Sequence, residues 1–294
     1  MPDIRQKTRT RRLLLTGAKA MEPLDLLRPG MPALDSIHDD RTTFKPTLRG
    51  PTYRILKTTE VDSYESTRPA KALRLALHGK KTPAPAAIAA AAKLSPAKGA
   101  LAAKPAAAAG DNFAGTARKA AKLSIAAAKT ENFTDVSKLI ASLTPVDQMV
   151  KLKISTSATS NRVAQEKRNV HVTGFLFAAS READNDFHLI VGRDPKAGQE
   201  TYMTMEISGL PPATSSAFAA LNTARTAYKQ FFGTKNLPGA GYHFYQPPIP
   251  VKVDGSLFFD ATHSKGQAPG PPSLKSRMPT IWEIHPVTKI KLGP

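Results

Sequence analysis

The 294-residue chain contains no cysteine, and this absence excludes several kinds of chemistry at once. Disulfide bridges, thiolate zinc sites and cysteine nucleophiles are ruled out, so a metal ion would need histidine, carboxylate or carbonyl ligands. No apolar run approaches the roughly 20 residues that a membrane-spanning helix needs. The basic start is followed only by the short run Leu13–Leu15, which is too brief for a secretory signal. We therefore expect a cytoplasmic protein without a membrane span.

The charge balance is strongly basic, with a formal net charge of +19. By sequence position, residues 71–130 hold about ten of these positive charges, whereas the C-terminal part is nearly balanced. A net charge of this size suggests an anionic partner, nucleic acid or another polyanion.

Composition divides the chain into four regions. We predict an extended N-terminal arm at residues 1–68 and an alanine-, lysine- and proline-rich flexible basic linker at 69–130, because prolines interrupt its alanine runs. Residues 131–147 carry apolar side chains at helical spacing and predict a short amphipathic helix. Residues 148–294 form the remaining region, a folded domain that begins with a half-buried strand at Val150–Ile154.

The folded domain shows a definite order of elements. Three β-rich segments at residues 168–183, 186–194 and 201–209 precede a helix between Ser215 or Ser216 and Gly233. Two further strands follow at residues 248–264 and 280–292. This order is typical of the OB-fold, so the sequence predicts a mainly β protein with an OB-like barrel and one helix between its third and fourth strands.

Several short motifs in this domain resemble those of a group of uncharacterised bacterial proteins. They are "HVTGFLF", "DFHLIV", "MTMEI", "VKVDGSLFFDATHSKGQ" and "WEIHPVTKI". The resemblance covers about residues 170–292 and none of the arm or linker. Several members of that group begin with export signals. The resemblance implies that the characteristic polar positions are Asp186, His188, Glu206, Asp260, His263, Glu283 and His285.

Three acid-histidine pairs stand out among these positions. Asp186 and His188 lie two apart in a predicted strand and share one face, as do Glu283 and His285. If the opposite, apolar face fills the barrel, the pairs lie outside it or at its rim. A carboxylate beside an imidazole suits a metal ligand, for which zinc or manganese would be the candidates, or a general base.

A polar network without a ligand is the alternative reading of these pairs, since exposed strand faces are polar in any case. We predict that Asp260 accepts a hydrogen bond from an imidazole nitrogen of His263. That bond would chiefly secure the start of the following loop, and it requires no metal or other cofactor.

A second set of residues suits polyanion binding. Basic side chains for phosphate contacts and aromatic side chains for stacking are Lys151, Lys153, Arg162, Lys167, Arg168, Tyr202, Tyr242, Phe244 and Tyr245. The first hypothesis is a non-enzymatic OB-like module that binds nucleic acid or another polyanion. The second is a structural or assembly protein whose arm orders on neighbouring subunits or another protein partner, and the third is a metal-dependent hydrolase.

Overall fold

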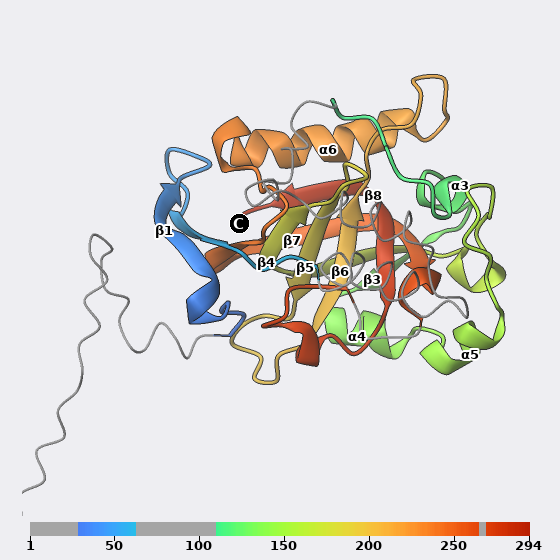
Figure 1. Ribbon diagram of the computed structural model, residues 1–294, viewed down its shortest axis with the longest axis horizontal. Coiled ribbons are helices and arrows are strands. Elements are labelled where there is room, and N and C mark those ends of the chain that lie inside the picture. Colours follow the sequence, from blue (N-terminus) through green and yellow to red (C-terminus); the bar gives the residue numbers. More distant parts are fainter. Residues whose placement is uncertain (1–28, 63–109, 265–268) are drawn as a thin grey trace, which may run out of the picture.

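The computed structural model describes residues 29–62, 110–264 and 269–294 (Figure 1). Within these ranges the protein is mainly β, with eight strands in one sheet and four α-helices. The strands are β1 (Ile37–Phe44), β2 (Tyr53–Thr58), β3 (Thr130–Phe133), β4 (Asn169–Arg181), β5 (Phe187–Gly192), β6 (Tyr202–Ile207), β7 (His243–Phe259) and β8 (Trp282–Leu292). The helices are α3 (Lys119–Lys122), α4 (Val136–Ala141), α5 (Val146–Lys151) and α6 (Phe218–Phe232). None of the described helices is both long and apolar enough to cross a membrane.

Five strands close a ring in the order β4, β5, β6, β8, β7 and back to β4. The β6–β8 pairing is parallel and the other four pairings are antiparallel. The long β4 pairs with both β5 and β7, and both registers shift between Leu176 and Ala178. These are the five strands and the intervening helix whose order the sequence predicted. The small OB-like barrel that we expected is not what forms, because β1, β2 and β3 extend these strands into one eight-stranded sheet.

The N-terminal arm contains a hairpin that the sequence analysis did not predict. Strands β1 and β2 pair with each other, and β2 continues the sheet by pairing with β7, Ile55 opposite Tyr245. Ile55 and Leu56 are fully buried, so this part of the predicted arm belongs to the folded core. Residues 1–28, and residues 69–109 of the predicted linker, lie outside the described residues.

The region between residues 110 and 151 also differs from the prediction. The last part of the predicted linker contains α3 and is packed against the domain, with Ala121 fully buried. Residues 130–133 form β3, parallel to β4, and the predicted amphipathic helix is divided into α4 and α5. Asp135 caps α4 by accepting a hydrogen bond from Ser137 N at 2.7 Å.

The strand predicted at Val150–Ile154 is wrong, because helix α5 runs through Lys151. Pro145 immediately precedes the first turn, where proline is favourable. Val150 and Leu152, whose alternation suggested a half-buried strand, are 41% and 44% exposed, whereas the adjacent Met149 is fully buried. The alternation of apolar and basic residues at Val150–Ile154 therefore does not reflect a strand with one buried face.

Helix α6 confirms the predicted helix and its stop, because it ends at Phe232 and is followed by Gly233, whose φ of 65° favours glycine. Its N-cap is Ala217, so neither Ser215 nor Ser216 caps it as expected. The Ser215 hydroxyl accepts from Ala217 N at 3.3 Å, one residue before the helix begins. Tyr228 packs on Phe187 with ring centroids 4.8 Å apart, and Phe232 packs on Tyr245 at 5.0 Å. In the view of Figure 1, α6 lies along one side of the sheet, opposite α4 and α5. The aromatic core therefore sits between α6 and the ring of strands.

Candidate functional site

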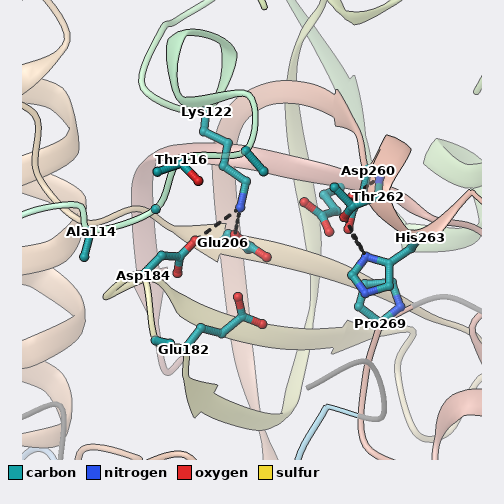
Figure 2. A pocket seen from close by; sticks show the side chains of 14 residues that line it. Ala114, Thr116, Lys122, Glu182, Asp184, Glu206, Asp260, Thr262, His263 and Pro269 are labelled. Atoms are coloured by element: carbon teal, nitrogen blue, oxygen red, sulfur yellow. Dashed lines mark hydrogen bonds and ion pairs between the residues drawn. The ribbon is translucent and has the colours of Figure 1, made fainter. Parts of the chain in front are cut away.

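A cavity of about 270 Å³ lies where α3 and its preceding loop cover the polar ends of several strands. Figure 2 shows Lys122 reaching into it from one side, with Asp260 and His263 on another wall. We call the buried and half-buried charged side chains in and beneath this cavity the acid-histidine chamber. Its members are Asp62, Lys122, Glu182, Asp184, Asp186, His188, Glu206, Asp260, His263, Glu283 and His285.

Strand register explains how distant residues meet in this chamber. His188 on β5 is directly opposite Glu206 on β6, and Thr204 of β6 is opposite Glu283 of β8. His285 follows two residues after Glu283 and therefore shares its strand face. The predicted same-face pairs thus combine across three neighbouring strands into one cluster.

Burial of this polar face contradicts the expectation that it lies outside the barrel or at its rim. Asp186, His188 and His285 are each 0% exposed, and Glu206 and Glu283 are nearly as deeply buried. The segment containing α3 covers this face, and its Lys122 side chain points into it. We had predicted that this segment was part of a flexible linker. A polar strand face became a buried site because an element from a distant part of the chain packs over it.

His285 lies at the centre of one group of carboxylates. Its Nδ1 is 2.8 Å from Glu206 Oε2 and 3.6 Å from Glu283 Oε2, and its Nε2 is 3.4 Å from Asp186 Oδ2. One ligand atom each from Asp186, Glu206 and His285 lie within 4.8 Å of one another. Neither His285 nitrogen, nor Glu206 Oε2 or Asp186 Oδ2, makes a hydrogen bond of good geometry within the described protein.

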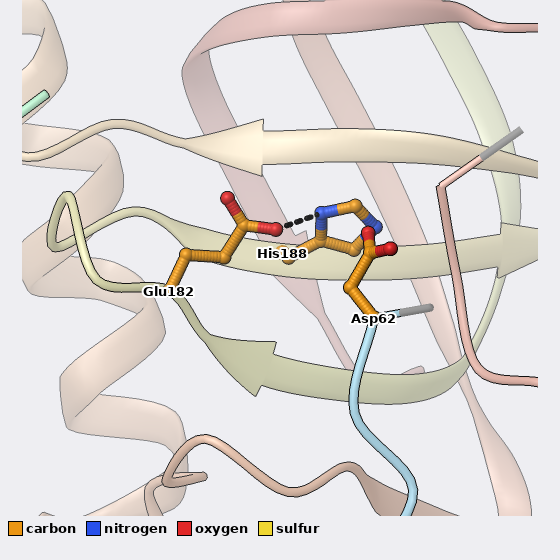
Figure 3. Close-up of side chains that lie close together, drawn as sticks. All are labelled: Asp62, Glu182 and His188. Atoms are coloured by element: carbon orange, nitrogen blue, oxygen red, sulfur yellow. Dashed lines mark ion pairs between the residues drawn. The ribbon is translucent and has the colours of Figure 1, made fainter. Parts of the chain in front are cut away.

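His188 lies at the centre of a second group (Figure 3). Its Nδ1 is 2.9 Å from Glu182 Oε1 and 3.3 Å from Glu206 Oε1. Ligand atoms of Asp62, Glu182 and His188 also lie within 4.8 Å of one another. Asp62 comes from the segment after β2, so a residue outside the ring of strands completes this group.

Lys122 supplies positive charge to the chamber. Its Nζ is 3.4 Å from Asp184 Oδ2 and 3.9 Å from carboxylate oxygens of both Asp186 and Glu206. Although burial lowers it, the carboxylates of Glu206, Asp184 and Asp186 raise the pKa of Lys122 well above its ordinary value. The lysine is therefore held in its charged form.

The carboxyl groups have strongly separated proton affinities. Burial raises the pKa of Glu206, but His285 and Lys122 outweigh it and hold that pKa well below its ordinary value. Burial and the Glu206 carboxylate raise the pKa of Glu283 well above its ordinary value and that of Glu182 to about 7. Such divergence within one cluster is typical of sites that bind ions or move protons.

Asp260 and His263 form the hydrogen bond that the sequence predicted, between Asp260 Oδ2 and His263 Nδ1. Asp260 also caps the short turn Ala261–His263 by accepting from Thr262 N at 2.9 Å. Burial lowers the pKa of His263, but its hydrogen bond to Asp260 raises that pKa above the ordinary value. The pair lines the cavity, so these side chains can contact a molecule bound there in addition to securing the loop as we predicted.

A buried arginine-glutamate pair fixes the strand end that carries Asp260. Arg118 Nη1 and Nη2 donate to Glu166 Oε1 and Oε2 at 2.6 and 2.8 Å, and both side chains are almost completely buried. Glu166 Oε1 also accepts from Phe259 N at 2.8 Å. Phe259, the residue before Asp260, is therefore held both by the Glu166 side chain and by its strand pairing with Trp282.

The predicted polyanion-binding residues do not form one surface. Arg162 is buried and donates to backbone carbonyls, including that of His285 at 2.6 Å, so it is not placed for a phosphate contact. Arg168 pairs with Glu131 at 2.6 Å. Of the remaining basic residues, Lys151 and Lys153 are exposed at and just beyond the end of α5, and Lys167 is exposed shortly before β4.

The predicted stacking platform is also contradicted. All four aromatic side chains are at most 2% exposed, namely Tyr202, Tyr242, Phe244 and Tyr245. Phe244 and Tyr245 lie on β7, which pairs with β2, and Phe232 of α6 packs on Tyr245.

Four members of the chamber were missed from the sequence: Asp62, Lys122, Glu182 and Asp184. The turn "READND" places Glu182 and Asp184 just before Asp186, and this concentration of acids beside the "DFHLIV" strand was a usable signal. Asp62 and Lys122 had no comparable signal, because each reaches the chamber through non-local packing.

Comparison of the chain with known protein families, curated proteins and solved structures finds no significant match.

Proposed function

We propose that the acid-histidine chamber binds a divalent cation and that the protein is a metal-dependent hydrolase. The observation that carries this proposal is the group formed by Asp186, Glu206 and His285. Their donor atoms converge within 4.8 Å, all three side chains are buried, and the group lies beside a cavity. Two carboxylates and an imidazole are suitable ligands for manganese or zinc without any cysteine.

A purely structural network accounts poorly for this many buried carboxyl groups. The chamber holds seven of them, against Lys122 and three histidines that would supply four positive charges even if all were protonated. Burial raises the pKa values of Glu182, Asp186 and Glu283, so their ionised forms are disfavoured in the metal-free chamber. A bound divalent cation would favour those ionised forms, and burial favours the neutral imidazole of His285 that a metal requires.

The chamber's own residues suit hydrolysis. A divalent cation at this position would polarise a bound water or a substrate oxygen. Lys122 is placed to stabilise negative charge that develops in the cavity, since its ammonium group lies among the lining carboxylates. His263, oriented by Asp260, is placed to move a proton at the opposite wall.

The test uses the full chain purified without chelators. Metal analysis should find manganese or zinc at close to one or more equivalents, and chelation should abolish hydrolysis of at least one substrate in a panel of chromogenic esters, amides and phosphate esters. His285→Gln should lose both metal and activity.

His171→Ala is the matched control, because His171 also contacts an aspartate, Asp254, but is half-buried and lies outside the chamber. This variant should keep both properties. A parent protein that holds no metal and gains no activity when metal is added would refute the proposal.

Polyanion binding is a second candidate, supported by the strand connectivity. The order β4, β5, β6, β8, β7, with α6 between the third and fourth of these strands along the chain, matches the strand order of an OB-fold. Arg118 and Lys122 are engaged inside the protein, so phosphate contacts would rely chiefly on residues 71–109. With about six contacts, log affinity for a single strand should fall with log salt at a slope near −4. Deletion of residues 71–109 should flatten the slope, and salt-independent binding would contradict this mechanism.

The assembly hypothesis finds less support in the described part of the arm. Strand β1 pairs with β2, and β2 pairs with β7 of the same chain, so this part does not need a neighbouring subunit to order it.

A further inference from the structure

Glu206 faces two histidines with its two carboxylate oxygens. Its Oε2 is 2.8 Å from His285 Nδ1, and its Oε1 is 3.3 Å from His188 Nδ1. The two histidines come from different strands, β8 and β5, and each lies among other carboxylates. Glu206 on β6 therefore stands between two separate donor groups, where a bridging carboxylate would have to be.

The second donor group has its own buried, unsatisfied atom. His188 is 0% exposed, and its Nδ1 makes no hydrogen bond of good geometry despite the nearby oxygens of Glu182 and Glu206. Figure 3 shows the carboxylates of Glu182 and Asp62 on either side of the His188 ring. This nitrogen lies at ion-pair distance from Glu182 without a well-aligned hydrogen bond, a position that also suits it to bind a cation held between the acids.

Backbone hydrogen bonds hold Asp62 near this group. Two residues earlier, Glu60 O accepts from Tyr242 N at 2.8 Å. The Glu60 side chain accepts from Ala33 N at 3.0 Å and from Ser273 N at 3.1 Å, which fastens the segment on both sides. Asp62 therefore lies near His188 on a segment that hydrogen bonds fix to the rest of the protein.

We propose that Asp62, Glu182 and His188 bind a second divalent cation and that Glu206 bridges it to the first. This inference rests on the proposed function, in which Asp186, Glu206 and His285 bind the first cation. Two cations would offset the carboxylate excess more completely than one, and paired sites of this kind hold both the attacking and the leaving oxygen of a hydrolysed bond.

The experiment measures the stoichiometry of manganese binding to chelator-treated full-length protein by calorimetry, with electron paramagnetic resonance to detect coupled pairs of ions. The parent should bind two equivalents and show a spin-coupled signal. Asp62→Asn and, independently, Glu182→Gln should each bind one equivalent without coupling. Glu206→Gln should lose the coupling and weaken both sites at least tenfold, and His171→Ala should behave as the parent.

The outcomes separate this inference from the proposed function. One equivalent in the parent, unchanged in Asp62→Asn, would overturn the second site and leave the first. No binding in the parent would overturn both. Two equivalents that persist in both Asp62→Asn and Glu182→Gln would show that the second ion lies elsewhere, and the assignment to His188 would be wrong. Because the parent's stoichiometry is informative by itself, a variant that fails to fold does not remove the test.

Discussion

Replacing Asp186 with asparagine should change stability in opposite directions in metal-free and metal-loaded protein. Asp186 Oδ1 accepts a hydrogen bond from Gly209 N at 2.6 Å, and the asparagine carbonyl can keep that bond. Lys122 retains Asp184 at 3.4 Å and Glu206 at 3.9 Å. Burial and the nearby Asp184 raise the pKa of Asp186 well above its ordinary value, so the metal-free chamber disfavours its ionised form. The substitution therefore removes an unfavourably placed carboxyl group and one metal ligand while leaving the local hydrogen bonding in place.

Distances in the chamber give the expected size of the stability change in metal-free protein. An ionised Asp186 within 4.8 Å of Glu206 is repelled by at least about 3.5 kcal/mol at an effective dielectric constant of ~20. Attraction to Lys122 at 3.9 Å offsets this by about 4 kcal/mol. The cost of desolvating the carboxylate and its repulsion from Asp184 then remain uncompensated. We expect Asp186→Asn to stabilise the metal-free protein by roughly 1–3 kcal/mol, a fraction of the several kcal/mol that burying an ion costs.

Bound metal should reverse the sign of the stability difference between Asp186→Asn and the parent. A cation present at 100 times its dissociation constant stabilises the folded parent by about 2.7 kcal/mol. The variant lacks a ligand and should gain much less, so the parent should become the more stable protein.

Denaturant unfolding in chelator and in excess manganese, followed by circular dichroism, measures both differences. Asp254→Asn, at the half-buried pair with His171 outside the chamber, should differ from the parent by the same amount in chelator and in manganese. If Asp186→Asn were destabilised equally in chelator and in metal, the chamber would be a structural polar network and our reasoning would be refuted.

Three further substitutions test the structure around the chamber. Glu166→Gln should destabilise the protein by about 3–5 kcal/mol in denaturant unfolding, because it leaves the buried Arg118 without its counter-charge; a change below about 1 kcal/mol would show that the pair does not anchor the strand end. Gly255→Ala should cost about 1–3 kcal/mol, since the added Cβ would lie 2.4 Å from Ile284 Cγ2, and an unchanged midpoint would contradict that packing. Burial raises the pKa of Asp111, but hydrogen bonds from Lys229 and Arg225 outweigh it and lower that pKa below 3.8. The carboxylate therefore stabilises the fold above pH 3.8 and loses this effect as the pH falls through the lowered value. The stability deficit of Asp111→Asn should accordingly be largest near neutral pH and fade in acid, and a deficit independent of pH would exclude the ion pair as its cause.

The parts of the fold that local patterns specify were predictable. The β-rich segments of β4, β5 and β6 and the helical stripe of α6 are properties of contiguous segments, and the order of these elements matches the structure. The pairing of Asp186 with His188 and of Glu283 with His285 on common faces followed from strand periodicity alone. Their identity as candidate site residues was likewise available from the sequence.

Non-local packing explains what the sequence did not show. Lys122 lies in an alanine-rich stretch that resembles the preceding linker, and only its contact with Asp184 marks it as part of the chamber. Strand β2 is short, and its burial depends on pairing with β7, nearly 200 residues later. The periodicity of the covered strands alone predicted that their polar faces would be exposed. We therefore expected the acid-histidine residues at a surface.

A crystal structure of the full-length protein soaked with manganese, with anomalous diffraction recorded at the manganese edge, would show whether Asp186, Glu206 and His285 bind a cation. We expect an anomalous peak at about 2.0–2.2 Å from a carboxylate oxygen of Asp186, one of Glu206 and a ring nitrogen of His285. A well-ordered chamber without a peak, at manganese concentrations that populate other sites in the crystal, would contradict it.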